Sequence, residues 1–217
     1  MPVNLAVLLS GSGTTLQNLI DRIKEGTLDA RIQIVISSKS TAYGLQRAKQ
    51  NQISTAVIRP KDFPDFQSFN QALWNKIREY PVDLVVLAGY LSLIEVPPDF
   101  HNRIMNIHPA LVPAFCGKGM YGHYVHEAVI KSGVKITGCT VHFVDEHYDH
   151  GPIILQESVP VLDEDTPETL AERVQVMERK LYPLAIQLFA ENRLKVEGNK
   201  VRILPPEQSN SLEGEKK

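Results

Sequence analysis

The chain has 217 residues, of which 43% are hydrophobic, enough apolar side chains for a substantial buried core. Its formal net charge of −2 gives no electrostatic reason to expect a nucleic-acid partner. Two cysteines, Cys116 and Cys139, are too few for a disulfide framework or a structural zinc site of paired cysteines. Because no targeting segment and no apolar run of bilayer length stand out, we expect a globular protein of the cytoplasm without a membrane partner.

The first half of the chain alternates short apolar runs with segments of helical spacing. The apolar runs predict strands at 5–9, 32–36, 55–58 and 84–87. Apolar residues three and four apart predict helices between them at 16–23, 43–51 and 66–77. The wholly apolar run at 84–87 is typical of a central strand covered on both faces. This alternation predicts the α/β class, with a mostly parallel central sheet and helices on both faces.

The second half of the chain follows a different order. It has predicted strands at 104–108, 136–144 and 153–159, and predicted helices at 125–131 and from Thr166 to about residue 192. Thr166 can cap a helix, and Pro167 is tolerated in a first turn. A Gly-Asn pair between short alternating runs predicts a hairpin at 194–204. We expect one domain over 1–206 and a disordered polar tail at 207–217.

Gly11 and Gly13 lie at the junction of the first predicted strand and helix. Backbone N–H groups at such a helix start, with hydroxyl groups nearby, can bind an anion. A dinucleotide is disfavoured, because Leu16 occupies the third glycine position of its fingerprint and residues 37–39 provide no acid for a ribose. We therefore predict a site for a single phosphate. A glycine turn that serves only chain reversal is the alternative.

Asn106 and His108 stand at the end of an apolar run that Pro109 stops. Side chains two apart in a strand share a face, so the two can point into one site. An amide that donates hydrogen bonds, beside a ring that titrates near neutrality, suits acyl chemistry. The alternative is a histidine at a strand end that only the local backbone holds.

The segment 145–151 is unusually rich in acids and histidines for a connection between two strands. Its histidines, like His123 and His126, are three apart and lack the spacing of a zinc-protease helix, so we expect no metal. A carboxylate from this segment could instead orient His108 and raise its pKa, since a negative charge favours the imidazolium. Which carboxylate does so stays open from the residues alone.

Taken in order, four motifs resemble those of the phosphoribosylglycinamide formyltransferases. They are Ser10-Gly11-Ser12-Gly13-Thr14, Leu87-Ala88-Gly89-Tyr90, Asn106-Ile107-His108-Pro109-Ala110-Leu111-Val112-Pro113, and Val141-His142-Phe143-Val144-Asp145-Glu146 with Asp149-x-Gly151-Pro152. Each motif is weak alone, but their order and spacing together are specific. The resemblance extends from about residue 4 to about residue 206 and implies a Rossmann-like formyltransferase fold.

The resemblance implies that Asn106, His108 and Asp149 form a catalytic trio that needs no metal. The trio would transfer the formyl group of 10-formyltetrahydrofolate to the amine of glycinamide ribonucleotide, a step of de novo purine biosynthesis. The positions that would bind the ribonucleotide are Gly13, Thr14 and Thr15 at its phosphate, with Gln175 and Glu178. The positions that would line the folate site are Tyr90, Leu91, Ser92, Leu93, Ile94, Val144, Asp145 and Glu146.

Two positions depart from the family pattern. Thr15 stands where asparagine is common, and Ser92 stands where many members have a basic residue near the folate. We therefore expect these departures to affect the affinity for folate more than catalysis. Methionyl-tRNA formyltransferase and formyltetrahydrofolate deformylase share the Asn-x-His core, but the extra domains that each would carry are not expected here. A non-catalytic nucleotide- or folate-binding module is a rival of a different class, and a nucleotide-dependent oxidoreductase ranks last. We expect a monomer or a homodimer.

Overall fold

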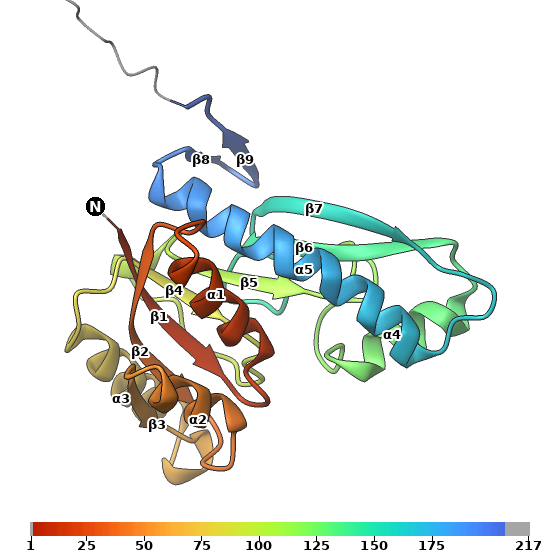
Figure 1. Ribbon diagram of the computed structural model, residues 1–217. Helices are drawn as coiled ribbons and strands as arrows, with labels where there is room; N and C mark the ends of the chain where they lie inside the picture. The colour runs from red at the N-terminus through yellow and green to blue at the C-terminus, as the bar shows by residue number, and fades with distance from the viewer. Residues whose placement is uncertain (1, 207–217) are drawn as a thin grey trace, which may run out of the picture.

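The computed structural model describes residues 2–206 of the chain (Figure 1), so the predicted tail at 207–217 lies outside the described residues. Within that part the strands are β1 (Val3–Leu9), β2 (Ala30–Ser37), β3 (Ser54–Val57), β4 (Leu84–Leu87), β5 (Ile104–His108), β6 (Ile136–Phe143), β7 (Ile153–Pro160), β8 (Leu194–Glu197) and β9 (Lys200–Ile203). The helices are α1 (Thr14–Lys24), α2 (Tyr43–Gln50), α3 (Phe66–Arg78), α4 (His123–Ser132) and α5 (Pro167–Ala190). Every predicted strand and helix is present, with ends displaced by a residue or two.

The described strands form one nine-stranded sheet in the order β3-β2-β1-β4-β5-β6-β7-β9-β8. The five strands at one side of the sheet, β3, β2, β1, β4 and β5, run parallel, because helices and long connections return the chain to the same end of the sheet. From β5 onward, β6 and β7 pair antiparallel. The predicted mostly parallel α/β sheet is confirmed, and its change of direction falls beside β5.

The sheet is covered on both faces, as the apolar runs predict. Alternate residues of β1 belong to different apolar clusters: Leu5, Val7 and Leu9 pack with α1, α2 and α5, whereas Ala6 and Leu8 pack with α3. Figure 1 shows α1 and α5 side by side on the near face of the sheet. No described helix combines the length and the apolar composition of a membrane-spanning segment.

Helix α5 begins where its sequence predicts. Thr166 is its N-cap and accepts a hydrogen bond from the N–H of Thr169, whose hydroxyl in turn accepts from the N–H of Thr166. Near its other end, the hydroxyl of Tyr182 lies 2.9 Å from the carbonyl oxygens of both Leu87 and Met105. This buried contact joins the helix to the end of β4 and to β5, the strand that contains Asn106 and His108.

Candidate functional site

Asn106 and His108 lie at the carboxyl end of β5, where parallel pairing with β4 changes to antiparallel pairing with β6. The hydrogen-bond ladders on both edges fix the strand, and its register places Asn106 opposite His142. His108 is buried, with 3% of its surface exposed. The two predicted residues therefore occupy a rigid position at the carboxyl end of a parallel strand, the end of the sheet at which ligands of α/β proteins commonly bind.

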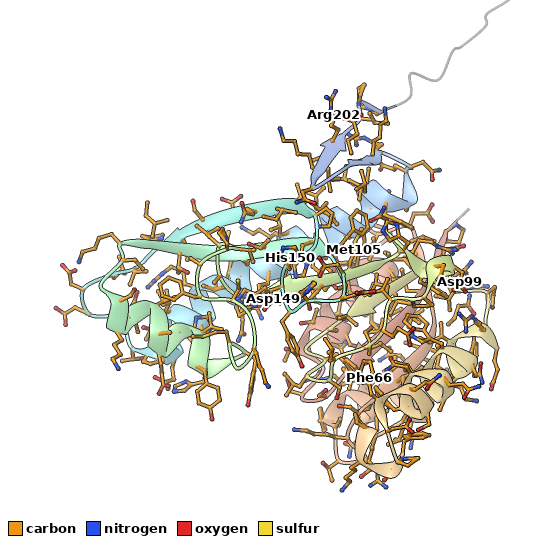
Figure 2. All side chains as sticks on the ribbon, turned by 180° about the vertical axis from the view of Figure 1, so that it is seen from behind. Phe66, Asp99, Met105, Asp149, His150 and Arg202 are labelled. Atoms are coloured by element: carbon orange, nitrogen blue, oxygen red, sulfur yellow. The ribbon has the colours of Figure 1, made fainter. Side chains whose placement is uncertain are left out.

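Asp149 reaches this pair from the loop between β6 and β7 (Figure 2). Its Oδ1 accepts a hydrogen bond from Asn106 Nδ2 at 3.2 Å, and its Oδ2 accepts one from the N–H of Gly117 at 3.0 Å. The same Oδ2 lies 3.4 Å from Nδ1 of His108. The structure thus brings the three predicted catalytic side chains into contact.

The ring of His108 is oriented by the backbone as well as by Asp149. Its Nε2 lies 2.8 Å from the carbonyl oxygen of Phe115. Because a carbonyl can only accept a hydrogen bond, we assign the proton of the neutral ring to Nε2, which leaves Nδ1 facing Asp149. Burial lowers the pKa of His108 below its ordinary value, an effect larger than the opposing effects of the Asp149 charge and the Phe115 contact. The ring is therefore a base whose protonated form has a carboxylate beside it.

Asp149 stays ionised although it is largely buried. Burial raises its pKa, but the neighbouring His142, the charge of His108 and the N–H of Gly117 together bring that pKa below its ordinary value. Its carboxylate is thus held by a donor from the loop at Gly117 and by a donor from β5, Asn106. This arrangement suits a group that stabilises a positive charge on His108.

His142 is a member of this network that the sequence reasoning did not select. Its Nδ1 donates to the carbonyl oxygen of Phe143 at 2.8 Å, so its Nε2 is free to accept from Asn106 Nδ2 at 3.2 Å. Both hydrogens of the Asn106 amide then have acceptors, His142 and Asp149, and the direction of the amide is fixed. The signal for His142 is its register opposite Asn106, which depends on a strand pairing between residues far apart in the sequence.

A cavity of about 410 Å³ opens over the trio, a size suited to a small organic ligand. Asn106, His108 and Asp149 all line it. The predicted folate positions that also line it are Tyr90, Leu91, Ser92, Leu93, Ile94, Val144 and Asp145. Glu146, the remaining predicted folate position, is not among the described residues that line the cavity, whereas its neighbours His147 and Tyr148 are. The loop 117–122 forms a further wall.

Four of the five predicted ribonucleotide residues, all but Gly13, line a second hollow, a narrow crevice between α1 and α5. Its volume is about 20 Å³, and its lining residues are Thr14, Thr15, Asn18, Gln175, Glu178 and Arg179. Asn18 and Arg179 were not selected from the sequence, because their position depends on how the two helices pack. Burial raises the pKa of Glu178 to about 7, against the opposing charge of Arg179.

Gly13 caps α1 in a left-handed conformation, with φ of 71° and no side-chain hydrogen bond to the first turn. The N–H groups of that turn are therefore not occupied by a side-chain cap, which is compatible with the predicted phosphate site but does not test it. A Cβ at Gly13 would come within 2.5 Å of the Cα of Gly44 in α2, so the position also requires close backbone approach. Arg47 of α2 donates to the carbonyl oxygen of Ser12 at 2.9 Å and adds a cation that the sequence reasoning missed.

Within residues 2–206, one set of side chains has the spacing of possible metal ligands: Asp145, His147 and His150, each with one ligand atom within 4.8 Å of the others. All three belong to one loop, and both histidines are well exposed. His150 Nδ1 already lies 2.6 Å from Asp145 Oδ2, so a hydrogen bond accounts for the closest contact. Asp145 also accepts from the N–H of His147 and so shapes the loop that carries Asp149.

The sequence is similar to known formyltransferases along most of its length. Residues 3–186 match the family described as formyl transferase. The phosphoribosylglycinamide formyltransferase of Haemophilus influenzae is 41% identical over 197 residues, which make up 90% of this chain and 91% of that protein. The bovine trifunctional purine biosynthetic protein adenosine-3 is 43% identical, but this chain spans only about a fifth (19%) of its length.

Solved structures of this group have the same fold. Glycinamide ribonucleotide transformylase 1 from Symbiobacterium toebii superposes with a TM-score of 0.88 at 45% identity, over 94% of this chain and 95% of that one. A formyltetrahydrofolate deformylase from Pseudomonas syringae superposes with a TM-score of 0.82 at 25% identity, over 94% of this chain and 67% of that one.

Proposed function

The chain belongs to the formyl transferase family, as the phosphoribosylglycinamide formyltransferases do, and on that premise we propose that it transfers a formyl group from 10-formyltetrahydrofolate to the amine of glycinamide ribonucleotide. The observation that carries the proposal is the meeting of Asn106, His108 and Asp149 at one cavity of about 410 Å³. The reaction would take place in the cytoplasm, as a step of purine biosynthesis.

In this mechanism Asn106 stabilises the oxygen of the formyl group. The amine attacks the formyl carbon, and negative charge develops on that oxygen as the new C–N bond forms. The Asn106 amide donates one of its hydrogens to this oxyanion, sharing or replacing the contact with Asp149. His142 accepts the other hydrogen and keeps the amide turned toward the cavity.

His108 and Asp149 manage the proton that the amine must lose. His108 is neutral near pH 7, because burial lowers its pKa, so it can accept that proton at Nδ1. The resulting imidazolium lies beside the carboxylate of Asp149, which stabilises it. The bond between the formyl carbon and N10 of the folate then breaks, and the proton passes to N10. Products are the formylated ribonucleotide and tetrahydrofolate, and the balance needs no further reactant.

The two hollows of the site divide the substrates between them. The cavity has apolar walls, including Leu91, Leu93 and Val144, which suit the flat ring system of a folate. The crevice joins the start of α1 to α5, and the uncapped first turn of α1 suits the phosphate of the ribonucleotide. Gln175 and Glu178 would then contact the remainder of that substrate.

A steady-state assay tests the proposal, with folate product followed by absorbance and both substrates varied. We expect product only when the ribonucleotide is present, and a large loss of turnover in His108→Ala. Folate product without ribonucleotide would instead indicate a deformylase, an alternative that the likeness to the Pseudomonas syringae enzyme makes specific. Binding of both ligands without turnover would indicate a binding module and would overturn the proposal.

A further inference from the structure

Helix α5 carries a backbone carbonyl without its normal helical partner. Pro183 lies inside the helix and has no N–H, so it cannot donate to the carbonyl of Arg179, four residues earlier. The amide of Asn18 in α1 donates to that carbonyl oxygen, with a distance of 3.0 Å from Nδ2. A side chain of one helix therefore takes the place of a missing backbone hydrogen bond in another.

This hydrogen bond lies at the crevice where the ribonucleotide is proposed to bind. Asn18 is four residues after Thr14 and three after Thr15, so the three share one face of α1. On α5, Arg179 is four residues after Gln175 and follows Glu178 directly. All six residues line the same crevice. The bond thus joins its two walls within one helical turn of the groups that would contact the substrate.

Few other polar contacts set the spacing of these walls. In the part of the chain that the structure describes, the Asn18 contact is the one side-chain hydrogen bond between α1 and α5. Near the other end of α5, Gln187 Oε1 accepts from the N–H of Asp29, which lies beyond the end of α1. Leu16 and Leu19 pack in the core cluster that α1 and α5 share, but such apolar contacts are less directional than a hydrogen bond.

We propose that Asn18 is a positioning residue for the ribonucleotide: by occupying the carbonyl that Pro183 leaves free, it sets the register of α1 against α5 and so the distance between the phosphate end and the ribose end of the site. The inference rests on the proposed function for the identity of the substrate. It assigns Asn18 no contact with the reacting atoms, so its effect should appear in substrate binding and not in the chemical step.

The first experiment compares Asn18→Ala and Asn18→Asp with the unchanged chain. Aspartate has nearly the shape of asparagine, but its carboxylate cannot donate to a carbonyl. Each variant should raise the KM for the ribonucleotide about fivefold, the size of one hydrogen bond. The kcat and the KM for the folate should stay within about twofold. Asn75→Ala, an exposed asparagine on α3, is the matched control and should leave every constant unchanged.

A double-mutant cycle with Pro183→Ala isolates the proposed cause. Alanine restores an N–H that can satisfy the Arg179 carbonyl within the helix, so adding Asn18→Ala in that background should raise the KM for the ribonucleotide much less. An equal increase in both backgrounds would overturn the inference. If Pro183→Ala does not fold, the single variants decide: an unchanged KM for the ribonucleotide, or equal changes in both KM values, would overturn it.

The same variants separate this inference from the proposed function. If the unchanged chain transfers no formyl group, the proposed function fails, and the helix contact is then read from thermal unfolding. Non-additive changes in Tm for Asn18→Ala and Pro183→Ala would show that the contact exists without a ribonucleotide site, and the inference about substrate would fall. Formyl transfer with additive changes in both Tm and KM would leave the proposed function intact and overturn the role of Asn18.

Discussion

The cavity and the crevice each contain a partly buried carboxyl group, and the two groups behave in opposite ways. Burial raises the pKa of both Asp149 and Glu178. At Asp149, the neighbouring His142, the charge of His108 and the N–H of Gly117 reverse this effect and keep the group ionised. None of the hydrogen bonds described for residues 2–206 reaches the side chain of Glu178, and its pKa stays near 7.

The two carboxyl groups differ in their surroundings: donors and cations overcome the effect of burial on the pKa of Asp149, whereas the charge of Arg179 does not overcome it at Glu178. An ionised Asp149 can stabilise an imidazolium at His108. A carboxyl that is half protonated at neutral pH can lie near a phosphate with less repulsion than an ionised one. On the proposed function, the cavity would stabilise charge that forms during the reaction, and the crevice would accept charge that arrives with the substrate.

The largest effect is expected from removing the charge of Asp149. Asp149→Asn keeps the size of the side chain but leaves the protonated His108 without a counter-ion, so kcat should fall by a factor on the order of a hundred or more. The kcat of Asn106→Ala should fall by a similar factor, because this change removes the oxyanion donor. Steady-state kinetics measure both. Asp163→Asn, at an exposed aspartate that pairs with Lys135, is the control, and normal turnover in Asp149→Asn would refute the trio.

The two sides of the trio were not equally predictable from the sequence. Asn106 and His108 belong to a strand, and the period of two places both on one face whatever the rest of the fold does. Asp149 belongs to a loop, and its own φ is 53°. Gly151 allows that loop to pass against Phe143, because a Cβ at position 151 would lie 2.0 Å from the carbonyl oxygen of Phe143. No periodicity encodes such a turn. Only the resemblance to a family selected Asp149 from the acids of its loop.

The fold as a whole was predicted more completely than the site. Apolar runs indicate strands and helices directly, and their alternation indicates the parallel half of the sheet. Contacts that depend on tertiary register were not predicted, such as His142 opposite Asn106 and Asn18 against Arg179. These residues carry no local pattern, because their partners lie on other elements. The roles assigned to Gly13, Thr14, Thr15, Gln175 and Glu178 stay predictions, although the last four line one crevice.

The next effect concerns Glu178 and the pH dependence of stability. Its pKa in the folded protein, about 7, lies above its ordinary value of 4.5, so the folded state binds more protons between these values. The contribution of this group to stability is therefore fully present below about pH 4.5 and is lost as the pH rises toward 7. The free energy of unfolding of Glu178→Gln, relative to that of the unchanged chain, should therefore increase by roughly 1–3 kcal/mol from pH 5 to pH 8. Urea unfolding at both pH values measures this, and a constant difference would show that Glu178 is not perturbed.

A smaller effect should separate Gly13 from Gly11, two glycines of the same turn. Gly13→Ala forces a Cβ toward Gly44 and strains a positive φ, so the start of α1 should shift and the KM for the ribonucleotide should rise about tenfold. Gly11→Ala places its Cβ where nothing lies within 4 Å, and it should leave that constant nearly unchanged. Equal effects of the two variants would mean that the turn is needed only for chain reversal.

The smallest effect is expected from removing the hydroxyl of Tyr182, which leaves the hydrogen bonds around Asn106 in place. Tyr182→Phe removes the hydroxyl that contacts the carbonyl oxygens of Leu87 and Met105, which should lower the free energy of unfolding by about 1 kcal/mol. The ladders from β5 to β4 and β6 remain, so Asn106 keeps its direction and kcat should stay within about twofold. Urea unfolding and kcat, measured on one preparation, decide the point. A fall in kcat as large as that of Asp149→Asn would mean that α5, rather than the strand ladder, positions Asn106, and the contrast between a rigid strand side and a donor-dependent loop side would not hold.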